Sequence, residues 1–105
     1  MDRQRRTEVF LQAAHRFAVA RLRAEPARIG EVRALLHRWR EQSGPTRSDR
    51  YWDEWERLLA LPLDDFERAI CSDDEHATVL RSVSPIGAVI SNAERRELLR
   101  EAGRA

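Results

Sequence analysis

Hydrophobic residues along the chain recur mostly at three- and four-residue steps, the spacing that places them on one face of an α-helix. The first such stripe, between residues 7 and 25, consists of Val9, Phe10, Ala13, Phe17, Ala20 and Ala24. The second, between residues 27 and 42, consists of Ile29, Val32, Leu35, Leu36 and Trp39. No segment alternates apolar and polar residues in the way a half-buried strand does. We therefore predict an all-α fold, a compact bundle of about five to seven helices with two longer N-terminal helices and several short C-terminal ones.

Glycine, proline and capping residues divide the rest of the chain. The strongest break is Ser43-Gly44-Pro45-Thr46-Arg47, after which Ser48 is a suitable N-cap for a helix over residues 49–60, and Pro62 precedes another helix over 63–70. Ser72 with Glu75 and Ser91 with Glu94 have capping-box spacing, Ser84-Pro85 fits the start of a short helix, and Gly103 fits the residue after the last helix. We predict one helical domain over residues 1–105: a basic helical hairpin (5–42), a linker (43–48) and an acidic, aromatic part (49–103).

Composition narrows the class of protein. A chain of 105 residues, 42% hydrophobic and 35% charged, has room for one core, and it is too apolar for a disordered chain. The single Cys71 has no partner for an internal disulfide, so we expect a reducing, cytoplasmic setting. No window resembles a signal peptide or approaches the ~18 apolar residues of a membrane span, and we expect no membrane partner.

The net charge of +1 conceals an uneven distribution. All 19 basic residues are arginines; residues 1–50 contain 12 Arg and 6 acids, a balance of +6, and residues 51–105 contain 7 Arg and 12 acids, a balance of −5. The protein therefore either folds its basic helices onto its acidic ones or offers each part to a different partner.

A protein-binding surface is the first functional interpretation of the acidic half. Tyr51, Trp52 and Trp55 place three large aromatic rings within five residues of one predicted helix. One reading is that these rings wedge the helix into the core against Trp39, with the acids as solvated helix faces. The other is that an exposed ring anchors a partner inside a polar rim, because Tyr and Trp are enriched at interface hot spots. The residues of this protein-binding site would be Tyr51, Trp52, Asp53, Glu56, Asp64 and Asp65.

Nucleic acid is the alternative partner, through the Arg-rich N-terminal helices and in particular Arg28, Arg33, Arg38 and Arg40. The sequence pI near 8.0 is below the value above about 9 that marks a basic nucleic-acid-binding domain, so protein binding is preferred. A homodimer through the first helix is a further hypothesis. Its basis is the long apolar stripe that includes Val9, Phe10, Phe17 and Leu22.

No catalytic or metal site is expected from the motifs. Cys71, Asp73, Asp74 and His76 lie close together, but zinc requires about four converging ligands and nothing elsewhere completes the set. The carboxylates would raise the pKa of the Cys71 thiol, which argues against a nucleophile. An acid–base pair such as Glu54 and His76 has no support from spacing, and the phosphate-loop and nucleophile-elbow motifs are missing. We expect a non-enzymatic protein without cofactor.

One stretch has a recognisable pattern: Tyr51-Trp52-Asp53-Glu54-Trp55-Glu56-Arg57-Leu58-Leu59, then Leu63, then 80–91 with its Ser84-Pro85 turn, then Glu94-Arg95. Residues 49–100 thus resemble a group of small all-helical bacterial proteins with a Trp/Leu-rich helix, a Ser-Pro turn and a Ser-capped Glu-Arg helix. Some members look like antitoxins or regulators of two-gene modules. The resemblance implies an interaction protein whose partner is a toxin or another protein, and it identifies no functional residue.

Overall fold

The computed structural model describes residues 2–104, which form six α-helices, two short 3₁₀ helices and no strand. In chain order the elements are α1 (Arg3–Ala24), η1 (Pro26–Arg28), α2 (Ile29–Ser43), α3 (Asp49–Leu58), α4 (Leu63–Cys71), α5 (Glu75–Ser82), η2 (Ile86–Val89) and α6 (Asn92–Arg104). The predicted all-α bundle with two longer N-terminal helices is confirmed.

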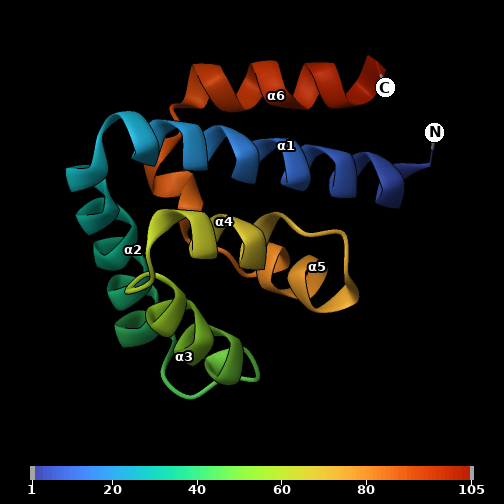
Figure 1. The fold of residues 1–105 in the computed structure, drawn as a ribbon. Coiled ribbons are helices and arrows are strands. Elements are labelled where there is room, and N and C mark those ends of the chain that lie inside the picture. The colour runs from blue at the N-terminus through green and yellow to red at the C-terminus, as the bar shows by residue number, and fades with distance from the viewer. Residues whose placement is uncertain (1, 105) are drawn as a thin grey trace.

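Helix α1 lies at the centre of the bundle, between α6 on one side and α4 and α5 on the other (Figure 1). Helix α6 runs antiparallel along one side of it, and α4 and α5 pack against the opposite side. Ala14, Ala18, Val19 and Leu22 of α1 are buried. Small residues at two of these positions let neighbouring helices approach α1 closely, so it can contact several elements at once.

The core is centred on the indole of Trp55, which is fully buried in α3. Its ring lies edge-on to that of Phe66 at 5.9 Å between centroids, and its Nε1 donates a hydrogen bond of 3.0 Å to the Leu80 carbonyl. Burying a ring of this size removes roughly 150–250 Å² from water, worth ~4–6 kcal/mol. The prediction that the aromatic cluster wedges α3 into the core is correct for Trp55.

Arg81 ties α5 to the end of α4. It is 7% exposed, and its Nη1 donates to the carbonyls of Ile70 at 2.8 Å and Ser72 at 2.7 Å. Gln12 of α1 donates to the Cys71 carbonyl at 2.6 Å. The last carbonyls of α4, which have no partner within the helix, are thereby satisfied by side chains of two other helices.

One predicted helix start is wrong, and one predicted cap residue is in place but makes no side-chain cap. The Ser91 capping box is confirmed: the Ser91 hydroxyl accepts from the Glu94 amide at 3.1 Å, and the Ser91 amide donates to the Glu94 carboxylate at 2.8 Å. The Ser72 box is wrong, because the N-cap of α5 is Asp74, whose carboxylate accepts from the Ala77 amide at 2.7 Å. Ser48 precedes α3 but makes no side-chain cap.

Other boundaries shift by a few residues. Helix α1 begins at Arg3, earlier than expected, because the Asp2 carboxylate accepts from the Arg5 amide and caps it. Helix α2 ends before Gly44, whose φ of 63° favours glycine. Gly103 lies inside α6 rather than after it. Helix α2 turns away from α1 at η1 instead of folding back along it, so residues 5–42 form a corner and not a packed hairpin (Figure 1).

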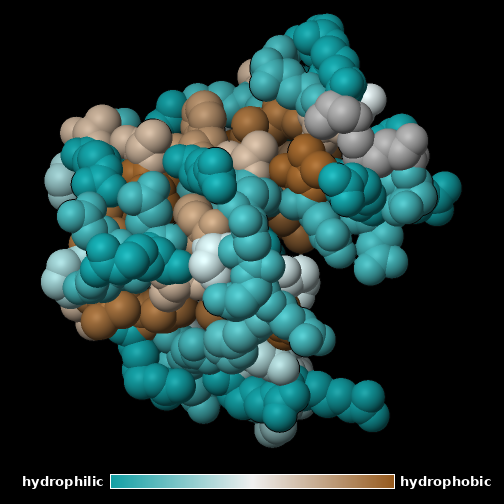
Figure 2. Space-filling model, turned by 45° about the vertical axis from the view of Figure 1, so that its right-hand side comes forward, coloured by the Kyte–Doolittle hydropathy of each residue, from teal (hydrophilic) through white to brown (hydrophobic). Residues whose placement is uncertain are grey.

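The surface is mostly hydrophilic. On the face drawn in Figure 2 the hydrophobic areas are small and are separated by hydrophilic side chains. Leu61 and Leu99 are the large apolar side chains that the described residues leave most exposed, at 43% and 38%. None of the helices within residues 2–104 has the length and hydrophobicity needed to cross a bilayer.

Candidate protein-binding site

Much of the charge predicted to face a partner is paired within the molecule. Arg40 of α2 contacts Asp53 at 2.6 Å and Glu56 at 3.4 Å, both on α3. Arg23 of α1 contacts Asp64 at 3.0 Å, and it contacts Glu67 of α4 at the same distance. The basic N-terminal helices are thus folded onto the acidic ones, the first of the two arrangements that the charge distribution allowed.

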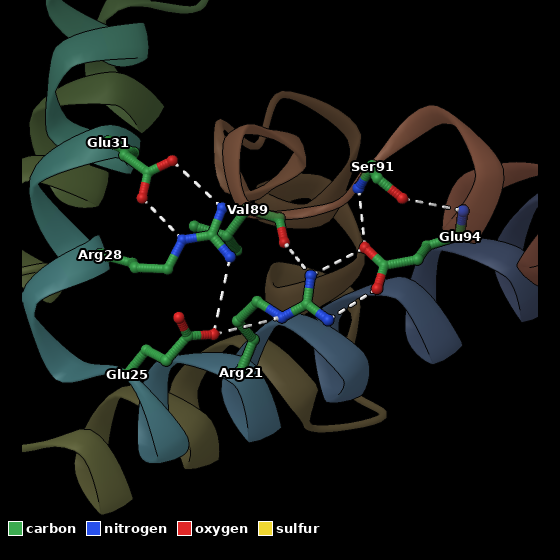
Figure 3. A network of polar contacts seen from close by, with 7 residues as sticks. All are labelled: Arg21, Glu25, Arg28, Glu31, Val89, Ser91 and Glu94. Carbon is green, nitrogen blue, oxygen red and sulfur yellow. Dashed lines mark hydrogen bonds and ion pairs between the residues drawn. The ribbon is translucent and has the colours of Figure 1, made fainter.

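A second ion-pair network joins α1 to the C-terminal helix (Figure 3). The Arg21 guanidinium donates two hydrogen bonds, of 2.7 and 2.6 Å, to the Glu94 carboxylate. It donates a third, of 3.2 Å, to the Val89 carbonyl. The hydrogen bonds from Arg21, followed by that from the Ser91 amide, lower the pKa of Glu94 to about 2. This bidentate pair fixes the start of α6 against α1.

The arginines of the nucleic-acid alternative are largely engaged. Arg28 pairs with Glu31 at 2.7 Å and with Glu25 at 3.7 Å (Figure 3), and its pKa is raised chiefly by the hydrogen bond to Glu31. Arg33 donates a hydrogen bond of 2.7 Å to the Leu59 carbonyl, and Arg40 forms an ion pair with Asp53 of α3. Among these four, only Arg38 makes no hydrogen bond or ion pair within residues 2–104. Carboxylates thus neutralise Arg28 and Arg40, whereas the exposed Arg33 and Arg38 keep their positive charge.

Part of the apolar stripe that suggested a homodimer is covered within the chain. Leu22 is buried in the core, and Phe10 and Phe17 are half-buried. The guanidinium of Arg95 on α6 lies 5.5 Å from the Phe10 ring centre, and that of Arg21 lies 5.0 Å from the Phe17 ring centre. Helix α6 therefore covers the Phe10 part of this stripe through Arg95, and the homodimer stays a prediction.

The six residues predicted to bind a partner fall into two groups. Tyr51, Trp52, Asp53 and Glu56 lie on α3, and Asp64 and Asp65 lie in the first turn of α4, where Asp65 pairs with Arg68. The acids of the first group face α2 and Asp64 faces α1. The two groups thus contact different neighbouring helices.

The two aromatic residues of the prediction are both half-buried. Trp52 turns inward: its Nε1 donates to the Val83 carbonyl at 3.0 Å and its ring lies 6.2 Å from that of Trp39. Tyr51 lies toward α5, with its ring 6.3 Å from that of His76 and with the Arg50 guanidinium 4.8 Å from its centre. Tyr51 lines an open hollow on the α5 side of α3, whereas Trp52 lines a separate cavity together with Trp39.

An open hollow of about 690 Å³ separates α3 from α5 beside Tyr51. Its polar lining includes the carboxylates of Glu54, Asp74 and Glu75, and no arginine lines it. The His76 ring contacts the Glu54 carboxylate at 2.8 Å. The apolar part of the lining is Ala69, Val79 and Leu80. The hollow combines negative charge, one aromatic ring and an apolar floor.

The three carboxylates of this hollow differ in the contacts that they make within the chain. Asp74 caps α5, and the Ser72 hydroxyl, followed by the Ala77 amide, lowers its pKa. The Glu54 side chain is 27% exposed, and its carboxylate contacts the His76 ring. Glu75 is exposed and makes no ion pair with any described residue. Glu75 is therefore a free carboxylate at the start of α5, whereas Asp53, Glu56 and Asp64 each contact an arginine of α1 or α2.

Sequence reasoning missed Glu54, Glu75 and His76 as members of this site. Glu54 and His76 are 22 residues apart on different helices, and no spacing rule connects them. A sequence signal did exist for Glu75, because it follows the acidic run Asp73-Asp74 in a segment without arginine.

Among the residues that the structure describes, neither an activated thiol nor a metal cluster is found. Cys71 is half-buried, and burial followed by the charge of Glu67 raises the pKa of its thiol. Within residues 2–104 no group of three His, Cys, Asp or Glu side chains is placed to hold a metal ion. Comparison of the chain with protein-family models, curated proteins and solved structures gives no match, so its function has to be argued from the geometry of its own surfaces.

Proposed function

We propose that this chain is a non-catalytic protein-binding module that recognises a basic segment of a partner protein at the hollow between α3 and α5. The observation that carries the proposal is the exposed, unpaired Glu75 carboxylate beside Tyr51 and Glu54, above an apolar floor.

The contrast with the other acids supports this choice of surface. Asp53, Glu56 and Asp64 already contact arginines of the same chain, and a partner would have to break these contacts before using them. Glu75 has no such contact, and its negative potential is available to steer a cationic segment toward the hollow. A tyrosine with an apolar floor supplies area that is removed from water on binding, which charge alone does not.

The partner class follows from the resemblance of residues 49–100 to antitoxin-like proteins. A toxin with a basic surface segment is the first partner to test. Its lysine or arginine side chains would approach Glu75 and Glu54, and their methylene stems would cover Ala69 and Val79.

The experiment is copurification from the native host with quantitative mass spectrometry, with and without nuclease treatment of the extract. Three forms of the chain are compared: wild type, Glu75→Gln and Glu101→Gln. Glu101 is an exposed residue of α6 with no ion pair to a described residue, so its variant makes the same change in net charge away from the hollow.

We expect wild type and Glu101→Gln to recover one protein in stoichiometric amount, and Glu75→Gln to recover several-fold less of it. Recovery of no stoichiometric protein contradicts the proposal. Equal recovery by all three forms also contradicts it, because the partner would then bind elsewhere. A partner whose recovery is lost on nuclease treatment would support the nucleic-acid alternative instead.

A further inference from the structure

A second cavity, of about 440 Å³, lies on a different part of the molecule. Helices α1, α2 and α3 and the segment 81–90 contribute its walls, and Arg95 of α6 also lines it. None of its lining residues lines the hollow beside Tyr51. Its volume is within the range of roughly 300–1,000 Å³ typical of small-molecule sites. The cavity is therefore separate from the proposed protein interface and large enough for a small organic molecule.

The apolar walls of this cavity are partly open to solvent. Three of them are aromatic rings from three different helices, and the rings of Trp39 and Trp52 lie 6.2 Å apart with an angle of 38° between their planes. Aromatic rings prefer other rings in tilted or offset arrangements, so these walls offer a flat ring accessible contact area. The apolar lining residues that are half-buried are Phe10, Leu11, Trp39, Trp52, Val83 and Ile90.

Two polar residues of the lining are buried and provide no hydrogen bond to a bound molecule. His15 is 1% exposed, and its Nδ1 donates to the Leu11 carbonyl at 2.7 Å, because a carbonyl can only accept. Its Nε2 is then an acceptor with almost no accessible surface. The guanidinium of Arg81 is spent on the carbonyls at the end of α4. Recognition of a ligand therefore depends on the accessible part of the lining.

The accessible charge of the lining is a single free guanidinium. Arg95 is exposed, and its guanidinium lies 5.5 Å from the centre of the Phe10 ring, which places the charge at an aromatic wall of the cavity. It makes no ion pair within residues 2–104, and the neighbouring carboxylate, Glu94, is held by Arg21. The lining contains no carboxylate. An anionic group at this wall would therefore meet a free guanidinium and no competing acid.

Open aromatic walls and one free cation together specify a ligand class. We infer that this cavity binds a small aryl carboxylate, whose ring packs between the Phe10 and Trp39–Trp52 walls and whose carboxylate pairs with Arg95. The ring covers aromatic surface that the folded chain leaves partly exposed, and a carboxylate matches the planar donor fork of an arginine. The inference is independent of the proposed protein interface, so either can fail without the other.

The ligand test uses three probes of increasing size: benzoate, 2-naphthoate and biphenyl-4-carboxylate. Calorimetry measures the affinity of each probe for the full chain. Two matched ligands accompany the probe that binds most tightly. Its carboxamide has the same shape without the charge, and the carboxylate with a saturated ring system keeps the charge without the aromatic face.

We expect saturable binding of at least one probe. The carboxamide should bind about three- to fivefold more weakly, because it loses the ion pair with Arg95, and the saturated analogue should bind several-fold more weakly. If none of the three probes binds saturably, or if either matched ligand binds as tightly as the probe, the inference is overturned.

The tryptophan indole N–H signals in a nitrogen–proton NMR spectrum locate the binding. The chain has three tryptophans: Trp39 and Trp52 line the cavity, whereas Trp55 is fully buried and does not. A bound aromatic ring should shift the signals of Trp39 and Trp52 more than that of Trp55; Trp39→Phe and Trp52→Phe assign the signals. Saturable binding that leaves the Trp39 and Trp52 signals in place would put the ligand elsewhere and contradict the inference.

A pair of matched variants tests the role of Arg95. Arg95 and Arg96 are both exposed neighbours on α6, and only Arg95 lines the cavity, so Arg95→Gln and Arg96→Gln make the same change in net charge at different places. In Arg95→Gln the carboxylate and its carboxamide should bind equally, whereas Arg96→Gln should keep the wild-type preference for the carboxylate. A preference that survives in Arg95→Gln, or that is lost equally in both variants, would show that Arg95 does not hold the carboxylate and would overturn the inference.

Discussion

The buried His15 makes the stability of the protein depend on pH in a defined way. Burial, opposed by the Leu11 hydrogen bond and reinforced by the charge of Arg81, lowers the pKa of His15 from 6.5 to about 4. Below about pH 6.5 the unfolded chain binds a proton that the folded protein excludes. The contribution to stability is therefore complete above the unfolded pKa and is lost as the pH falls toward the folded pKa.

The size of this effect follows from the two pKa values. A difference of about 2.5 between them, at about 1.36 kcal/mol for each pH unit, corresponds to about 3 kcal/mol by the time the pH reaches about 4. That is a large fraction of the ~5–15 kcal/mol expected for the whole domain. A surface histidine such as His37, which is 74% exposed, has no comparable burial.

Urea denaturation at a series of pH values between about 7 and about 4, for wild type and His15→Leu, measures the effect. Carboxylates titrate in both proteins, so their contributions largely cancel in the difference between the two free energies of unfolding. We expect wild type to lose about 3 kcal/mol relative to His15→Leu across this interval. A difference that stays constant with pH would show that His15 titrates normally, and would refute its placement as a neutral buried acceptor.

Three other substitutions test the packing and the ion pairs. Trp55→Phe removes the donor to Leu80 and some core volume, and it should cost about 2 kcal/mol in urea denaturation. Arg81→Met leaves two carbonyls at the end of α4 without their guanidinium, and it should cost roughly 2–3 kcal/mol in the same assay. Glu94→Gln loses the bidentate contact with Arg21; we expect Tm to fall by a few degrees near neutral pH in calorimetry, with the deficit vanishing as the pH falls through about 2, where wild-type Glu94 is itself protonated.

Local sequence signals, namely apolar periodicity and capping residues, are sufficient to predict most of the helices. The apolar periodicity gave α1 and α2, and Ser91 with Glu94 gave the start of α6 because both caps lie within one turn. The start of α5 was misassigned for a tertiary reason. The Ser72 carbonyl is held by Arg81 at the end of α4, so Ser72 belongs to that helix end and Asp74, two residues later, becomes the cap.

The ion pairs and cavities of the surface could not be predicted from the sequence to the same extent. Summing the charges of each half of the chain predicts the sign of each half, but it does not predict which residues form ion pairs. Arg23 and Asp64, for example, are 41 residues apart in the sequence. The cavity around His15 draws its walls from several separate segments, and nothing in the local sequence distinguishes His15 from a residue on the edge of a helical stripe. Tyr51 was selected for its residue type, and the hollow that gives it a role comes from the approach of α5.

Binding of a partner protein at the hollow beside Tyr51 is the proposal on which the function of this chain depends. The most direct measurement is the affinity of the copurified partner for wild type, Glu75→Gln and Glu101→Gln at two salt concentrations. We expect Glu75→Gln to bind the partner several-fold more weakly, with a smaller dependence on salt, and Glu101→Gln to match wild type. Equal affinities and equal salt dependence for all three proteins would contradict it.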